Sequence, residues 1–91
     1  MQQIASVFDK IFKRPGLKEY LIEGQIQAIW PQIVGRQIAQ LSKPVHFKNG
    51  NLFVRVSSPA WRNELNMMRS QIAFKMNEKI GMDVVKSIIL R

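Results

Sequence analysis

The dipeptide Asn49-Gly50 restricts the folds open to this chain more than any other feature of its sequence. It stands between residues 43–48 and 51–57, two segments in which apolar and polar residues alternate. Such alternation is typical of a strand with one buried face, and Asn-Gly between two such strands is the strongest short signal for a type I′ turn. Residues 43–57 are therefore predicted to form a β-hairpin.

A two-residue turn also predicts the register of this hairpin. The expected pairs are Lys48 with Asn51, Phe47 with Leu52, His46 with Phe53, Val45 with Val54, and Pro44 with Arg55. Residues that face each other across a hairpin share a face of the sheet. One face is then wholly apolar and comprises Val45, Phe47, Leu52, Val54 and Val56. The other face comprises Pro44, His46, Lys48, Asn51, Phe53, Arg55 and Ser57.

Helical periodicity precedes the hairpin. Apolar residues at positions 4, 7, 8, 11 and 12 have the spacing of an amphipathic helix, which is predicted to end at Pro15-Gly16. A second helical run begins near Leu17, and Pro31 either kinks it or starts a third helix that reaches Leu41. Gly24 and Gly35 weaken this pattern, and we interpret them as points of close helix packing.

A long helix is predicted to follow the hairpin. Ser58 suits its N-cap and Pro59 its first position, and the apolar spacing continues to about Ile80, before Gly81. The main apolar stripe comprises Trp61, Leu65, Met68, Ile72 and Met76, so Trp61 is expected in the core. Arg62, Asn66 and Arg69 form a polar stripe on its flank.

A second apolar pair on this helix admits two interpretations. Met67 and Phe74 lie seven residues apart, away from the main stripe. We favour a second core contact, made if the helix packs between the sheet and an N-terminal helix. The alternative is an exposed patch for a protein partner.

The last segment, DVVKSIILR over residues 83–91, is rich in β-branched residues and is predicted to be a third strand. It runs parallel to the second hairpin strand if the two are neighbours, and the sheet is antiparallel throughout if it lies beside the first. The predicted fold is α+β, with a three-stranded sheet covered on one face by helices, in a single domain over residues 1–91.

Composition excludes several classes of function. The chain has no cysteine and one histidine, His46, so no metal site or cysteine nucleophile is predicted. Its glycines match no phosphate-binding loop, and Glu19 and Glu23 are interpreted as a solvated helix face. No run is long and apolar enough to span a bilayer. We expect a cytoplasmic protein that is not an enzyme, binds no cofactor and has no membrane partner.

Charge points instead to a polyanionic partner. The 91 residues carry a net charge of +8, and residues 24–77 hold seven basic residues and one acid. Basic side chains interleaved with an aromatic ring on a sheet face suit single-stranded nucleic acid, because cations hold phosphates and a flat ring stacks on a base. The predicted binding residues are Lys43, His46, Lys48, Phe53, Arg55, Arg62 and Arg69. Alternatively, an N-terminal helix covers Phe53 and His46.

Several residues also carry a resemblance to a known family. They are Trp30 with Val34-Gly35, Pro44, Asn49-Gly50 with Leu52 and Val54, Ser58 with Trp61 and Leu65, and Asn77 with Gly81. Together with the final strand they resemble the DciA-like family (domain of unknown function 721) of bacterial replicative-helicase loaders, over nearly the whole chain after residue 15. The resemblance implies a KH-like fold, binding to the DnaB-type replicative helicase, and affinity for DNA.

The sequence leaves three hypotheses for function. The leading one is a replication factor that interacts with the helicase and binds DNA weakly, without sequence specificity. The second is a stand-alone KH-like module that binds RNA, although the chain lacks the GxxG loop with which KH domains clamp RNA. The third is an interaction protein whose charge serves solubility.

Overall fold

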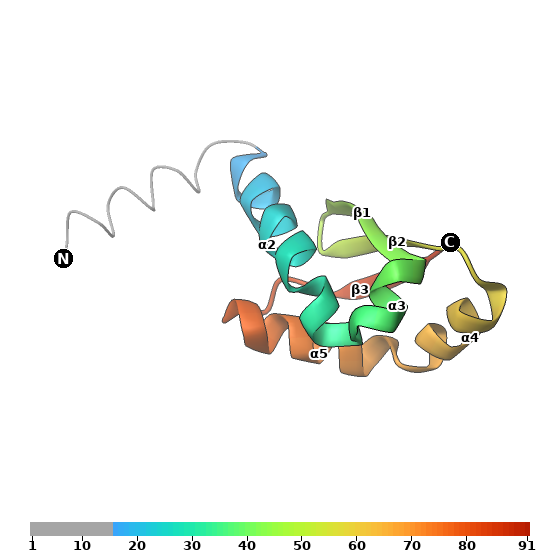
Figure 1. Ribbon diagram of the computed structural model, residues 1–91. Helices are drawn as coiled ribbons and strands as arrows, with labels where there is room; N and C mark the ends of the chain where they lie inside the picture. Colours follow the sequence, from blue (N-terminus) through green and yellow to red (C-terminus); the bar gives the residue numbers. More distant parts are fainter. Residues whose placement is uncertain (1–15) are drawn as a thin grey trace, which may run out of the picture.

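The computed structural model describes residues 16–91, and the helix predicted over residues 4–12 lies outside them (Figure 1). Its elements in chain order are α2 (Leu17–Val34), α3 (Arg36–Leu41), β1 (Ser42–Lys48), β2 (Asn51–Val56), α4 (Pro59–Met67), α5 (Arg69–Ile80) and β3 (Ser87–Leu90). Helices therefore flank a hairpin and a final strand completes the sheet. The predicted α+β class is confirmed.

The hairpin turn has the predicted conformation. Asn49 has a φ of 54° and Gly50 a φ of 82°, and a type I′ turn requires positive φ at both positions. Gly50 is needed for a second reason, because a Cβ there would lie 2.7 Å from Cγ of Lys86. The Gly50 carbonyl accepts hydrogen bonds from the backbone N–H groups of Lys86 and Ser87. The turn thereby fixes the start of β3.

The predicted register of the hairpin is correct near the turn and wrong farther from it. Three pairs are as predicted, from Lys48 with Asn51 to His46 with Phe53. The register then shifts, and Pro44 faces Val54 while Lys43 faces Arg55. A bulge at Val45 inserts one unpaired residue and reverses the alternation before it. As a result, Pro44 is buried and Val45 is 42% exposed, opposite to the predicted faces.

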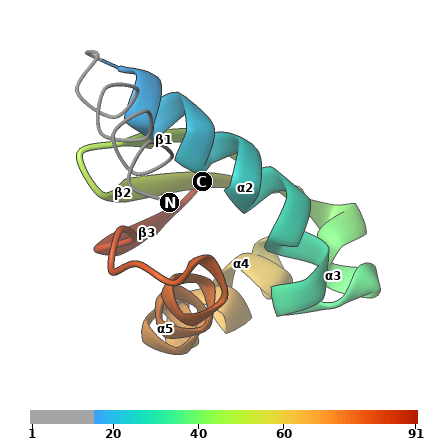
Figure 2. The same ribbon diagram turned by 90° about the vertical axis from the view of Figure 1, so that its left-hand side faces the viewer.

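Strand β3 lies beside β2 and runs parallel to it, which resolves the two topologies left open by the sequence. Figure 2 shows β2 between its two neighbours. The side chain of Asn77 on α5 sets the path into β3. Its Oδ1 accepts from the N–H groups of Val84 and Val85, and its Nδ2 donates to the Val85 carbonyl.

The core lies between the helices and one face of the sheet. Its buried side chains come from α2, from all three strands, from α4 and α5, and from the loop before β3: Ile22, Ile26, Trp30, Phe47, Leu52, Val54, Val56, Leu65, Ile72, Met76, Val85 and Ile88. The indole Nε1 of Trp30 donates to Oγ of Ser42 over 3.0 Å, which satisfies a buried polar group on each residue. Trp61 packs against this core but remains partly exposed.

The helix before the hairpin breaks at a glycine. Pro31 lies inside α2, which ends at Val34, and Gly35 follows with a φ of 92° before α3 begins. Pro31 therefore does not start a third helix. A Cβ added at Gly24 or Gly35 would meet no heavy atom within 4 Å in the described part of the chain, so the predicted close helix packing is not found within residues 16–91.

The helix after the hairpin is two helices. Its start is as predicted, because Oγ of Ser58 accepts from the Trp61 N–H over 3.3 Å. The helix is interrupted at Met68, whose N–H bonds to the Leu65 carbonyl in a tighter turn. The predicted continuous helix is wrong, and Met68 is 37% exposed instead of buried. The chain leaves α5 at Gly81, as expected.

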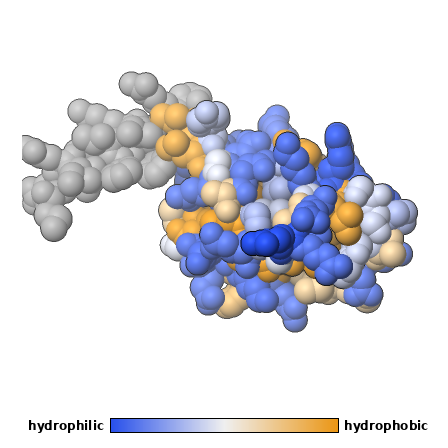
Figure 3. Space-filling view, viewed as in Figure 1, coloured by the Kyte–Doolittle hydropathy of each residue, from blue (hydrophilic) through white to orange (hydrophobic). Residues whose placement is uncertain are grey.

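The second apolar pair does not enter the core. Met67 is 76% exposed and Phe74 is 65% exposed, so our preferred interpretation of these residues was wrong. On the side of the molecule seen in Figure 3, apolar side chains lie at the surface around the first turns of α2, among mainly hydrophilic ones.

Within residues 16–91, no helix is long and apolar enough to cross a membrane.

The two tryptophans should differ in their effect on stability. Trp30 is 2% exposed and Trp61 is partly exposed. We expect Trp30→Ala to lower the free energy of unfolding by about 3–5 kcal/mol and Trp61→Ala by about 1–2 kcal/mol. Urea unfolding followed by circular dichroism measures both values. Equal losses would contradict the arrangement of this core.

Candidate nucleic-acid interface

The candidate site lies on the outer face of the sheet, the face turned away from the core. Leu52, Val54 and Val56 point into the core, so the alternation of β2 turns Phe53 and Arg55 outward. The bulge at Val45 brings Lys43 into register with Arg55. The bulge, which was not predicted, therefore places Lys43 as one more cation beside this face.

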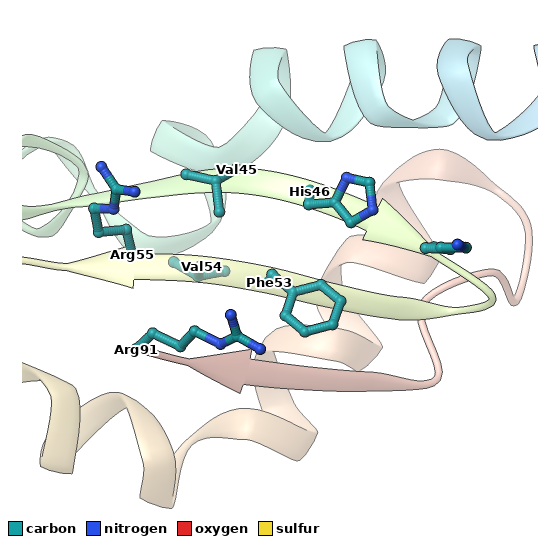
Figure 4. Close-up of a pocket in the computed structure, with 7 residues that line it drawn as sticks. Val45, His46, Phe53, Val54, Arg55 and Arg91 are labelled. Atoms are coloured by element: carbon teal, nitrogen blue, oxygen red, sulfur yellow. The ribbon is translucent and has the colours of Figure 1, made fainter.

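An open hollow of about 600 Å³ lies on the outer face. It is lined by Val45, His46, Lys48, Phe53, Val54, Arg55 and Arg91, and we call it the outer-face hollow. Figure 4 shows His46, Phe53 and Arg91 close together, each from a different part of the sheet. The structure thus brings together four of the predicted binding residues, His46, Lys48, Phe53 and Arg55.

The ring of Phe53 is flanked by two polar side chains. The guanidinium carbon of Arg91 lies 4.9 Å from the ring centroid, a cation–π contact. The ring centroid of His46 lies 5.8 Å from that of Phe53, with the planes tilted by 40°. Phe53 is half-buried and His46 is exposed. A planar aromatic surface therefore lies among cations at the surface of the molecule.

Arg91 was missed by the sequence analysis. It follows β3, and its N–H and carbonyl bond to Val54 and Val56 of β2, so it continues the strand pairing. The alternation of β3 turns Ile88 into the core and Arg91 to the face of Phe53. This alternation would have pointed to Arg91 if β3 had been placed beside β2. The sequence left that placement open.

The outer face has a uniform sign of charge. Among the strand residues of the described part that point outward, none is acidic. Lys43, Lys48 and Arg55 come from the hairpin, and Arg91 follows β3. Nearby acids are engaged elsewhere, because Oε1 of Glu19 accepts from the Asn49 N–H at the turn and Asp83 pairs with Lys86. The field over this face favours an anion.

The described helices do not cover this face. The buried residues of α2, Ile22, Ile26 and Trp30, pack into the core on the opposite side of the sheet. At the edge of β1, the side-chain amide of Gln27 donates to the Pro44 carbonyl. The alternative that a helix covers Phe53 and His46 therefore does not hold for α2. For the helix predicted over residues 4–12, the question lies outside the described residues.

The structure separates Arg62 and Arg69 from the outer-face hollow. Arg62 is half-buried, and its Nη2 donates to the Val56 carbonyl over 3.4 Å at the end of β2. Its Nε is buried without a partner within residues 16–91. Arg69 is exposed and borders a different hollow, between α5 and β3. The predicted binding residues are thus divided between separate parts of the surface.

Comparisons with known proteins agree with the resemblance found in the sequence. A family model described as "Dna[CI] antecedent, DciA" matches residues 3–90. A UPF0232 protein of Rhodococcus jostii is 36% identical over 87 residues, which cover 96% of this chain. UPF0232 proteins of Mycobacterium tuberculosis and Mycobacterium leprae are 31% and 33% identical over the same share of the chain. The chain spans 46% of the length of each of these relatives.

Arg55 of β2 and Arg62 of α4 should differ in their contribution to stability. We expect Arg62→Ala to lower the free energy of unfolding by about 1 kcal/mol, because it removes a partly buried hydrogen bond to Val56. Arg55→Ala should change it by less than about 0.5 kcal/mol, because Arg55 is exposed. Parallel urea titrations measure the difference. A larger loss for Arg55→Ala would contradict these assignments.

Proposed function

The chain belongs to the DciA family, and from this premise we propose that it is part of a DNA-replication factor that acts with the DnaB-type replicative helicase. The family match over residues 3–90 supports this proposal. The proposed role is one of interaction, for which the cations and rings of the outer-face hollow are suited.

We further propose that the outer-face hollow binds single-stranded DNA. The observation that carries this proposal is the ring of Phe53, flanked by Arg91 and His46 within a group of cations. Lys43, Lys48, Arg55 and Arg91 hold phosphates by charge, and the ring of Phe53 stacks with a base. A base must leave the duplex to reach such a ring, so single strands bind more tightly than duplex DNA.

Binding at this face has no strong sequence preference. Stacking on Phe53 accepts any base, because every base has a π-face. The side chain of Asn51 could read a base edge, but its Oδ1 already accepts a hydrogen bond from the hydroxyl of Ser87, which leaves only its NH2 group for a base. Arg62, which lies at the end of β2, extends the contact when a longer strand is bound and contributes less than the residues that line the hollow. Arg69 borders a different hollow and is not part of the proposed site.

The salt dependence of binding tests the number of phosphate contacts. With about four phosphates neutralised, the log–log slope of affinity against salt concentration should be roughly −3. We expect Arg55→Ala and Arg91→Ala each to flatten the slope by a fraction of a unit to one unit and to weaken all sequences alike. Fluorescence anisotropy on labelled oligonucleotides of about 15 nucleotides measures these slopes.

The stacking role of Phe53 has a different signature. We expect Phe53→Ala to lose roughly 1–3 kcal/mol of binding free energy with little change in the salt slope, because no phosphate contact is removed. Lys79→Ala is the matched control for charge, since Lys79 is exposed near the end of α5 and outside the hollow. Unchanged affinity and slope in a folded Phe53→Ala/Arg55→Ala/Arg91→Ala variant would refute the hollow as the DNA site.

The remaining hypotheses are separated by the choice of ligand. RNA of the same sequence, run beside DNA in these titrations, tests the KH-like RNA-binding alternative, and tighter RNA binding would favour it. Capture of the replicative helicase of the same organism by the immobilised chain tests the partner. Because the outer-face hollow is the proposed DNA site, the Arg55→Ala/Arg91→Ala variant should still capture the helicase when the preparation is treated with nuclease.

A further inference from the structure

Helix α2 is apolar on two opposite sides. On one side, Ile22, Ile26 and Trp30 enter the core, where α2 packs against β1 and α5. At about 100° per residue, a second apolar stripe lies on the other side of the helix. We call it the outer stripe of α2, and it comprises Leu17, Tyr20, Leu21, Gly24 and Ala28. Because Tyr20 is 72% exposed and Leu21 is 40% exposed, this stripe favours a packing partner.

An open hollow of about 330 Å³ lies over the outer stripe. Within the described part of the chain, all the residues that line it belong to α2: Tyr20, Leu21, Glu23, Gly24 and Gln27. Apolar surface is visible beside the first turns of α2 in Figure 3. A second helix laid along α2 would therefore bury apolar side chains and close this hollow.

Gly24 is a separate observation that points to a close neighbour on this side. Glycine inside a helix is less favourable than alanine, because it loses more backbone freedom on folding. Within residues 16–91, a Cβ at Gly24 would meet no heavy atom within 4 Å, so nothing there requires a glycine. A large side chain seated on the helix at this point would require one, because a Cβ would occupy the same space.

The segment just before α2 has the matching sequence pattern. Its apolar residues, Ile4, Val7, Phe8, Ile11 and Phe12, have the spacing of an amphipathic helix. At 1.5 Å per residue, residues 4–12 would span about 14 Å, and the outer stripe spans about 17 Å. Only residues 13–16 separate this segment from α2. Gly16 has a φ of 78°, a left-handed conformation in which the chain can reverse its direction.

We propose that residues 4–12 form a helix that packs antiparallel on the outer stripe of α2. In this arrangement Phe12 lies beside Leu17, and the ring of Phe8 lies over Leu21 and Gly24. The polar residues Ser6, Asp9 and Lys10 fall on the opposite side and face water. A helix of nine residues is marginal by itself in water, so contact with α2 is what stabilises it.

Two arguments favour this segment over a second copy of the chain as the occupant. A connection of four residues holds the segment beside α2 at a millimolar effective concentration. Two copies of the chain, each with a net charge of +8, repel one another. Packing within one molecule is therefore favoured over exchange of the segment between two molecules.

The proposed position leaves the outer-face hollow open. Helix α2 packs on the core side of the sheet, and its outer stripe is turned away from that core (Figure 2). A helix on this stripe does not reach Phe53 and His46, which lie on the other face of the sheet. The proposal does not rest on DNA binding, because its first test measures only the formation and contacts of the helix.

Amide hydrogen exchange on the full chain tests the proposed contact. The amides of residues 8–12 should exchange at least about tenfold more slowly than those of an unstructured peptide of the same sequence. Leu21→Glu should remove most of this protection, because it places a charge beneath Phe8. Met67→Glu is the matched control, since Met67 is 76% exposed on α4, and it should leave the protection unchanged. Unprotected amides in the natural sequence, or protection that survives Leu21→Glu, would overturn the proposal.

Gly24→Ala separates a packed glycine from an exposed one. In the natural background the added Cβ should displace Phe8 and lower the melting temperature by roughly 2–5 °C. In the Leu21→Glu background, where the segment is detached, the same change should raise the melting temperature by a similar amount, because alanine is the better helix former. Thermal scans by circular dichroism measure both shifts. Shifts of the same sign in the two backgrounds would contradict the contact at Gly24.

Two further measurements distinguish the other positions of the segment. Phe8→Ser should change the affinity for single-stranded DNA by less than about twofold, because it removes no charge and lies away from the outer-face hollow. Markedly tighter binding would mean that the segment covers that hollow, and would overturn the proposal. Light scattering should give a monomer at the concentration used for exchange. A dimer that Leu21→Glu dissociates would mean that the segment is exchanged between copies, and would equally overturn it.

Discussion

The parallel pairing of β3 with β2 is the contact on which the rest of the structure depends. It begins at the hairpin turn, where the Gly50 carbonyl accepts two backbone N–H groups, and it ends at Arg91. The pairing places Ile88 in the core and Arg91 over the ring of Phe53. A residue more than thirty positions from Phe53 in the chain thereby becomes part of the same site.

The second constraint is the division of the sheet into a buried and an open face. Helices α2, α4 and α5 bury the apolar residues of one face, and no outward-pointing strand residue in the described part is acidic. Cations that repel one another across the outer face would destabilise it if they were buried, but exposure to water screens them. The open face therefore retains a positive electrostatic field at little cost in stability. We propose that this field attracts DNA.

Much of this architecture was evident in the sequence because the signals were local. Asn49-Gly50 specified the turn, Ser58 with Pro59 specified the start of α4, and Gly81 marked the end of α5. His46, Lys48, Phe53 and Arg55 were correctly grouped, because period-two alternation near the turn depends on few residues. The resemblance to the DciA family also came from such positions, and the match over residues 3–90 agrees with it.

The sequence alone thus determined the fold class, the turn and the grouping of the nearest outward residues. The tertiary structure alone decided the bulge at Val45, the break at Met68, and the placement of β3. Each of these features depends on the energy with which distant segments of the chain pack together. A local sequence pattern does not reveal that packing energy. For the same reason, only the structure brought Arg91 to Phe53 and separated Arg69 from the outer-face hollow.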